Sequence, residues 1–246
     1  IRRCAIATNY RSAAPVVEFG NAIMQGRGIQ SKAASREPGV VQLLDLATFR
    51  PNPRECELFP GETLTPAIRR VLATALREGG SVGLLARQNR LSSQTGSRFA
   101  EDLDRLRDEW LSGYPAEKRD RVRVSTAHKF KGLEDDTIVI LEAVERSFPL
   151  IHPDWVFTRV LGDDPQKLLA DERRLFYVAC TRAKRRLILI TDGKRMSPFL
   201  QAGQPRFTYA SWIDFPFVPV ADDRWIIEVG SKPGLGASPT VAVKDF

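Results

Sequence analysis

Residues 122–141 and 171–190 each combine an apolar run typical of a β-strand with a dense group of polar side chains. In the first block, the run VRVS is followed at once by Thr126, His128 and Lys131. A hydroxyl, an imidazole and an ammonium group spaced so closely after a strand can bind one or two phosphates of a nucleic-acid backbone without reading its sequence. The alternative interpretation is a polar loop with a structural histidine.

The second block predicts a helix over residues 171–183. Asp171 and Glu172 open this helix, where acidic side chains suit the positive N-terminal end. Basic side chains crowd its other end: Arg182, Lys184, Arg185 and Arg186. Such clustering is explained equally well by complementarity to the helix dipole, so by itself it assigns no function.

The composition indicates which classes of protein this chain can belong to. With 246 residues and 43% apolar content, the chain can bury a substantial core, and its net charge of +7 favours an anionic partner. The three cysteines are widely spaced without a CxxC pair, which predicts neither a disulfide framework nor a metal site, and Cys180 is expected to be a buried, inert thiol. No apolar run approaches 18 residues and no signal peptide opens the chain, so we expect a cytoplasmic protein without membrane contact.

Strand-like and helical segments alternate along most of the chain. Apolar runs of strand length occur at 40–46, 81–86, 122–125, 137–141 and 186–190, and helical spacing occurs at 13–24, 63–76 and 171–183. This alternation predicts an α/β fold with a mainly parallel sheet flanked by helices. Ligands of such sheets bind at the carboxyl ends of the strands, and we expect the polar groups of both blocks there.

Two segments depart from this alternation. Residues 92–121 have room for a small helical insertion of one or two helices. From residue 197 onward Gly and Pro become frequent, and RWIIEV and TVAVKDF are typical of two strands. We therefore divide the chain into a main domain over 1–196 and a small β-rich C-terminal extension over 197–246.

The two blocks also carry a family resemblance. TAHKFKGLE at 126–134, followed by ERRLFYVACTRA at 172–183, resembles the fifth and sixth motifs of the UvrD/Rep group of superfamily 1 DNA helicases, and helicase IV-like members in particular. The resemblance implies a RecA-like, P-loop NTPase-type domain, the second motor domain of such an enzyme. It covers residues 6–191 in motif order and is most specific over 122–190.

In that family the threonine and histidine of the fifth motif contact the backbone of single-stranded DNA. By motif position these residues are Thr126 and His128, and Lys131 lies with them. The same motif implies that Glu134 lies near the nucleotide ribose, and that Gly132 lets the backbone turn close to the nucleotide.

The resemblance also implies two arginines directed at the γ-phosphate. Arg182 matches the arginine finger of the sixth motif, and Arg87, in LLARQN, occupies the place of the fourth motif in sequence order. We therefore expect these two guanidinium groups to meet beside one groove. Many members carry a tyrosine just before the second arginine, stacked on adenine, but this chain has Ala86, which puts base stacking there in question. Tyr10 and Arg11, in TNYRS, are expected to border the nucleotide cleft.

The sequence contains no GxxxxGK[ST] loop, since its Gly193-Lys194 pair is followed by Arg195 and Met196. We expect ATP and Mg²⁺ to be bound mainly by an N-terminal motor domain of the same protein, with this chain inactive alone. Its first residue is not methionine, which fits a start within a longer protein. Two alternatives to the motor interpretation are a non-catalytic nucleic-acid-binding module and a helicase-derived module that docks a partner protein.

Overall fold

The computed structural model describes residues 7–91, 102–150, 164–193, 195–204 and 206–220. Its centre is a sheet in which all neighbouring strands are parallel, as the alternation of strands and helices predicted. The strands lie in the order β5 (Val122–Thr126), β4 (Val82–Ala86), β6 (Asp135–Ile140), β7 (Ala183–Thr191), β3 (Val40–Asp45) and β8 (Thr208–Tyr209).

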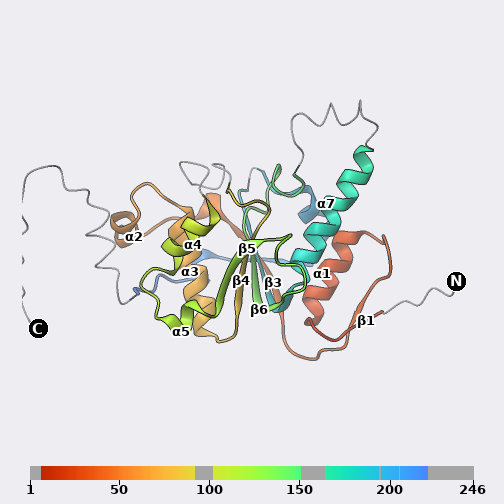
Figure 1. The fold of residues 1–246 in the computed structure, drawn as a ribbon, viewed down its shortest axis with the longest axis horizontal. Coiled ribbons are helices and arrows are strands. Elements are labelled where there is room, and N and C mark those ends of the chain that lie inside the picture. Colours follow the sequence, from red (N-terminus) through yellow and green to blue (C-terminus); the bar gives the residue numbers. More distant parts are fainter. Residues whose placement is uncertain (1–6, 92–101, 151–163, 194, 205, 221–246) are drawn as a thin grey trace, which may run out of the picture.

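Helices cover both faces of the sheet, which gives three layers (Figure 1). One face packs against α1 (Ala14–Met24), α7 (Pro165–Cys180) and α8 (Pro198–Gly203). The other packs against α3 (Leu64–Arg77) and α4 (Leu103–Leu111). The shorter elements are α2 (Pro53–Leu58), α5 (Ala116–Arg119), the 3₁₀ turns Leu46–Thr48 and Trp212–Asp214, and a separate parallel pair, β1 (Thr8–Asn9) and β2 (Lys32–Ala33).

The central strands are apolar on both faces because each face meets a layer of helices. Every residue of β4 is buried, and Leu84 belongs to the core beneath α3 while Leu85 belongs to the core beneath α1 and α7. The strands predicted between residues 40 and 190 and the helices predicted at 13–24 and 63–76 are confirmed. Cys180 is fully buried at the end of α7, and burial raises the pKa of its thiol well above 9.0, which confirms the inert interpretation.

The connection from β5 to β6 determines where the polar residues of 126–134 lie. Both strands are parallel neighbours of β4, so the chain must return from the carboxyl end of β5 to the start of β6 across β4. Phe130 is buried in this crossover, and a Cβ added at Gly83 of β4 would lie 3.1 Å from its ring. Gly83 therefore lets the crossover pass close to the sheet.

Helix α7 begins earlier than the sequence predicted. Its first residue is Pro165, and the side chain of Asp164 caps it by accepting a hydrogen bond from the Gln166 amide at 2.9 Å. Asp171 and Glu172 therefore lie in the middle of the helix, and the prediction that they complement its N-terminal dipole is wrong.

The described part of the C-terminal segment packs on the same two cores as the rest of the chain. Phe199 and Phe207 join the core beneath α1, and Trp212 and Phe215 join the core beneath α3. Over 197–220 the structure shows α8, a 3₁₀ turn and the two-residue strand β8, which extends the main sheet. The strands predicted in RWIIEV and TVAVKDF lie outside the described residues, so the division at residue 197 stays a prediction.

Candidate phosphate-binding sites at two edges of the sheet

The candidate residues fall on two opposite edges of the sheet. We call the edge where the parallel strands end the carboxyl edge, and the edge where they begin the amino edge. In Figure 1 the amino edge lies toward the bottom, where α5 and β1 are labelled, and α7 runs from the upper part of the molecule toward the middle.

At the carboxyl edge, Arg87 follows β4 and lies beside the end of β5. Its guanidinium makes two bonds to Glu172 of α7, from Nε to Oε2 at 3.0 Å and from Nη2 to Oε1 at 2.6 Å. Its Nη1 also lies 3.4 Å from Nδ1 of His128. Glu172 accepts a further hydrogen bond from the Leu150 amide at 2.9 Å, so this carboxylate joins three segments of the chain.

Thr126, His128 and Lys131 form the rest of the carboxyl-edge candidates. Thr126 ends β5 directly opposite Ala86, and its buried hydroxyl oxygen accepts a hydrogen bond from the Lys129 amide at 3.3 Å. The side chains of His128 and Lys131 are exposed. The hydroxyl of Thr126 therefore helps to shape the turn, while the imidazole and the ammonium group are accessible to a ligand.

At the amino edge, Glu134 holds two basic side chains. It forms an ion pair with Arg11, and its Oε1 lies 3.2 Å from Nζ of Lys184. Burial alone would raise the pKa of this carboxyl, but the hydrogen bond from Lys184 and the positive charges of Arg11 and Lys184 outweigh it. The pKa of Glu134 therefore lies below its usual value of 4.5.

Arg182 belongs to the same cluster. Its Nε donates to the backbone oxygen of Val178 at 3.0 Å, in the last turn of α7. Partial burial and the positive charge of Arg11 lower the pKa of Arg182, while the negative charge of Glu134 opposes that shift. Arg11 and Lys184 are thus paired with one carboxylate, and Arg182 lies close enough to feel the charges of Arg11 and Glu134, an arrangement suited to a ligand with more than one negative charge.

An ion pair between an exposed arginine and a buried carboxylate fixes the position of Glu134. The neighbouring Asp135 is fully buried, and its carboxylate is paired with Arg123, whose Nη2 also donates to the backbone oxygen of Glu134 at 2.9 Å. The Asp135 amide donates to the backbone oxygen of Arg182 at 3.2 Å. The starts of β6 and β7 are therefore tied together, and with them the side chains of Glu134 and Arg182.

Tyr10 and Gly132 lie beside these amino-edge residues in sequence. Tyr10, next to Arg11, is 79% exposed. Gly132 is exposed and has a φ of +92°, and a Cβ added to it would meet no atom within 4 Å. The backbone conformation, and not lack of space, is therefore what favours glycine at position 132.

The structure does not bring Arg87 and Arg182 together. Arg87 lies just beyond the end of β4, whereas Arg182 directly precedes β7, whose first residue pairs with Asp135 at the start of β6. About seven strand residues, or roughly 20 Å, separate the two levels. The expectation that these two guanidinium groups meet beside one groove is therefore wrong, and the guanidinium near Arg182 is that of Arg11.

The inference from Ala86 also needs correction. Ala86 is fully buried and belongs to the core beneath α3. A larger side chain at this position would point into the core and away from the amino edge. Ala86 therefore carries no information on how a base is bound there.

The structure reveals two partners that sequence reasoning missed. The sequence suggests a helix terminus for Glu172, and its pairing with Arg87, 85 residues away in the chain, has no local signal. In the sequence, Lys184 is only one member of a basic cluster. Successive residues of β7 point to opposite faces of the sheet, so Lys184 forms an ion pair with Glu134 while Arg185 forms one with Asp136.

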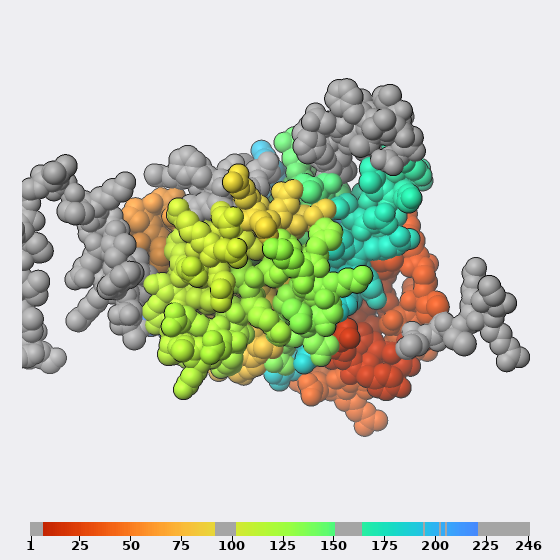
Figure 2. All heavy atoms as spheres, viewed as in Figure 1, coloured from red at the N-terminus to blue at the C-terminus, as the bar shows by residue number. Residues whose placement is uncertain are grey.

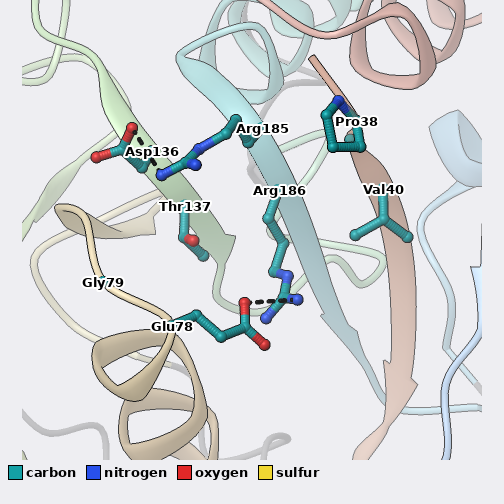
Figure 3. Close-up of a pocket in the computed structure, with 9 residues that line it drawn as sticks. Pro38, Val40, Glu78, Gly79, Asp136, Thr137, Arg185 and Arg186 are labelled. Carbon is teal, nitrogen blue, oxygen red and sulfur yellow. Dashed lines mark ion pairs between the residues drawn. The ribbon is translucent and has the colours of Figure 1, made fainter.

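A cavity of about 300 Å³ also lies at the amino edge (Figure 3). Its charged groups are paired across it, with Arg186 Nη2 2.7 Å from Glu78 Oε2 and Arg185 Nη2 3.5 Å from Asp136 Oδ1. Two cations and two anions leave no net charge among these four groups, so this cavity does not attract a strongly charged ligand.

The described ranges offer no support for a metal centre or a membrane span. Within them, no group of three or more His, Cys, Asp or Glu side chains is placed to hold a metal ion. No helix in the described part of the chain is long and apolar enough to span a membrane.

Residues 102–194 match the family described as the UvrD-like helicase C-terminal domain. A probable DNA helicase of Mycoplasma pneumoniae is 42% identical over 71 residues, which are 29% of this chain and 12% of that protein. An ATP-dependent helicase/nuclease chain of Bacillus thuringiensis is 31% identical over 143 residues, covering 47% of this chain and 11% of that protein. This chain thus spans about one tenth of the length of the curated relatives it matches.

Among solved structures, the C-terminal domain of a possible DNA helicase from Lactobacillus plantarum has a TM-score of 0.45 and 18% identity, covering 82% of this chain and 99% of that one. The family match spans β5, β6, α7 and β7, and with them Thr126, Glu134 and Arg182. The family match covers less than half of this chain, and residues 102–194 are therefore similar to the C-terminal domain of UvrD-like helicases.

Proposed function

We propose that this chain is the second motor domain of a UvrD/Rep-type, ATP-dependent DNA helicase. One observation carries the proposal: Arg11, Glu134 and Arg182 cluster at the amino edge, while His128 and Arg87 lie at the opposite edge. A motor needs a nucleotide site and a nucleic-acid site that are distinct yet mechanically connected. The two edges supply such a pair of sites.

The nucleotide would bind at the amino edge, between this chain and a first motor domain. When bound, ATP supplies the γ-phosphate that is transferred to water. Arg11 and Arg182 would stabilise the negative charge that develops during this transfer, and Glu134 would accept a hydrogen bond from a ribose hydroxyl. The exposed ring of Tyr10 would pack on the base, and Gly132 would let the backbone approach the nucleotide. Mg²⁺ would be held mainly by the first motor domain.

The ion pair between Arg11 and Glu134 suggests how the site prepares for its ligand. Because both side chains are more than one third exposed, the pair is weak and Arg11 can exchange its carboxylate partner for a phosphate. Lys184 stays beside Glu134 and keeps the carboxylate ionised when Arg11 moves.

Single-stranded DNA would bind at the carboxyl edge. His128 and Lys131 would bind backbone phosphates, and Thr126 would hold the turn that presents them. Helix α7 connects this edge to the other, because Glu172 in its middle binds Arg87 and its last turn binds Arg182. Movement of Arg182 toward a γ-phosphate would therefore be transmitted to the DNA-facing residues.

The proposal is tested by measuring ATP hydrolysis by the full-length gene product with and without single-stranded DNA, and oligonucleotide binding by this chain over a range of salt concentrations. We expect stimulated hydrolysis by the full-length product, none by this chain alone, and an affinity that falls steeply with salt. A partner-docking module would show salt-insensitive protein binding and no affinity for single strands. That result would overturn the proposal.

A further inference from the structure

A second cavity, of about 270 Å³, opens at the carboxyl edge beside Arg87. It lies where β4 and β6 end, and three of the residues that line it are arginines: Arg87, Arg90 and Arg146. β4 is flanked by β5 on one side and β6 on the other, so Arg87 lies between His128 and this cavity. Figure 2 shows the yellow segment that includes residues 87–91 in contact with green and cyan segments on one continuous surface.

The charges of this cavity are not balanced as they are in the amino-edge cavity. Arg87 is paired with Glu172, but within the part of the chain that the structure describes no carboxylate is paired with Arg90 or Arg146, and both side chains are exposed. Glu142 is the one acid in the described lining, and it lies buried on the floor, where its Oε2 accepts a hydrogen bond from Ser147 Oγ at 3.2 Å. Two guanidinium groups at the rim are thus available to an anion.

The backbone around the cavity is held in an unfavourable conformation. Glu142 has a φ of +52° and Arg146 a φ of +69°, values that side chains other than glycine rarely adopt. The turn is nonetheless well fixed, because the amides of Ser147 and Phe148 both donate to the Val144 oxygen, at 3.2 and 3.0 Å, and the Glu145 amide donates to the Arg195 oxygen at 2.7 Å. Strain of this kind concentrates at functional sites.

Packing gives no reason for arginine at position 146. Its side chain is exposed, has no ion pair among the described residues, and occupies a backbone conformation in which glycine costs less. A ligand that binds this guanidinium group would account for an arginine here.

We infer that Arg90 and Arg146 form a binding site for a phosphodiester of single-stranded DNA, next to the phosphate bound at His128. The inference rests on the proposed function, since it extends the DNA track of the carboxyl edge. The strand would run from the end of β5 past Arg87 to the end of β6. Arg87, fixed by Glu172, would separate the two phosphate positions, and the exposed guanidinium groups would bind the second one without reading the base.

The test is the affinity of this chain for a fluorescently labelled oligothymidylate, measured by anisotropy at several salt concentrations. In Arg146→Gly and in Arg90→Ala we expect a roughly tenfold loss of affinity. This loss corresponds to the lower end of the free energy that a hydrogen bond to a charged group contributes. The slope of log K against log salt should become shallower by about 0.7 for each phosphate that is no longer bound. Because glycine relieves the positive φ, Arg146→Gly should also melt at the same or a higher temperature than the unmodified chain.

A matched control removes the same charge at the other edge. Arg119 of α5 is exposed and has no ion pair among the described residues, so Arg119→Ala should change the affinity less than twofold. If Arg119→Ala lost as much affinity as Arg146→Gly, the loss would reflect net charge in general, and the proposed phosphate site would be wrong.

The remaining outcomes separate this inference from the proposed function. If His128→Ala weakens binding while Arg146→Gly and Arg90→Ala do not, the DNA track stands and the second phosphate site is wrong. If the unmodified chain binds no oligonucleotide at low salt, both fail. If inorganic phosphate raises the melting temperature only when Arg146 is present and oligonucleotide affinity is unchanged by Arg146→Gly, the site binds a free anion and the assignment to a strand is wrong.

Discussion

The ion pairs at the two edges of the sheet differ in how firmly they are held. Arg11 and Glu134, at the amino edge, have side chains that are 43% and 37% exposed, whereas those of Arg87 and Glu172, at the carboxyl edge, are 13% and 16% exposed. An exposed pair in water contributes little and exchanges partners easily, while a shielded pair with two good hydrogen bonds fixes geometry. The amino edge is therefore suited to a ligand that displaces a side chain, and the carboxyl edge to a strand that binds a preformed surface.

Two segments connect the edges. Residues 127–134 cross the sheet from His128 to Glu134, with Phe130 buried between them. Helix α7 binds Arg87 through Glu172 and ends next to Arg182. In the proposed motor, one rigid helix and one short crossover thus connect the nucleotide and DNA sites.

The largest expected effect is that of Arg182→Ala on ATP hydrolysis, and it should be confined to the amino edge. In the full-length gene product, Arg182→Ala should lower DNA-stimulated ATP hydrolysis by about 10³-fold or more, because the transferred phosphoryl group loses a guanidinium partner. The affinity for single-stranded DNA should change less than twofold. The control is Arg87→Ala, which should weaken DNA binding and leave the KM for ATP nearly unchanged. An unchanged rate in Arg182→Ala would favour the nucleic-acid-binding module without catalysis.

The difference in burial predicts a difference in stability. Glu172→Ala removes the partner of a shielded guanidinium and should lower the free energy of unfolding by about 2 kcal/mol. Glu134→Ala breaks an exposed cluster and should cost less than about 1 kcal/mol. Urea denaturation of this chain, monitored by circular dichroism, measures both. Equal losses would remove the distinction between a fixed and an exchangeable edge.

Substitution of His128 should affect only the DNA binding assigned to the carboxyl edge. Its side chain is exposed, so His128→Ala should leave the melting temperature unchanged. Without this imidazole, oligonucleotide binding should weaken by roughly tenfold or less, because one phosphate loses a hydrogen-bond partner. The KM for ATP of the full-length product should stay within twofold. A raised KM for ATP with normal DNA affinity would place His128 at the nucleotide site.

The smallest effect concerns pH at the amino edge. Because the pKa of Glu134 is lower in the folded chain than its usual 4.5, its interactions stabilise the fold above that value and are lost as the pH falls through the folded pKa. Glu134→Gln should therefore reduce the difference in stability between neutral pH and about pH 3. Urea titrations of both proteins at several pH values measure this difference. Identical pH profiles would show that Lys184 and Arg11 do not stabilise the carboxylate.

The fold was predictable because the pattern of each strand agrees with its place in the sheet. SVGLLA at 81–86 is apolar throughout, and β4 is buried on both faces. The edges were not predictable in the same way. The rule that ligands bind at carboxyl ends placed Glu134 and Arg182 at the wrong edge, because both precede a strand, and only the strand order shows that the chain crosses β4 before Glu134.

The candidate residues of 126–134 and Arg182 followed from their spacing and from the family resemblance, but the grouping of the arginines did not. Arg87 and Arg182 both adjoin strands, and a sequence does not state at which end of the sheet each side chain lies. The pairing of Arg87 with Glu172 depends on a contact between segments 85 residues apart. Such pairs arise from packing and leave no periodic signal in either segment.

The most direct test is hydrogen–deuterium exchange of the full-length gene product with single-stranded DNA and, separately, with a non-hydrolysable ATP analogue. We predict that DNA protects amides at 87–91 and 126–131, and that the analogue protects amides at 9–11, 132–134 and 181–184. Protection of the amino-edge amides by DNA alone, or of the carboxyl-edge amides by the analogue alone, would contradict the assignment of the two ligands to opposite edges.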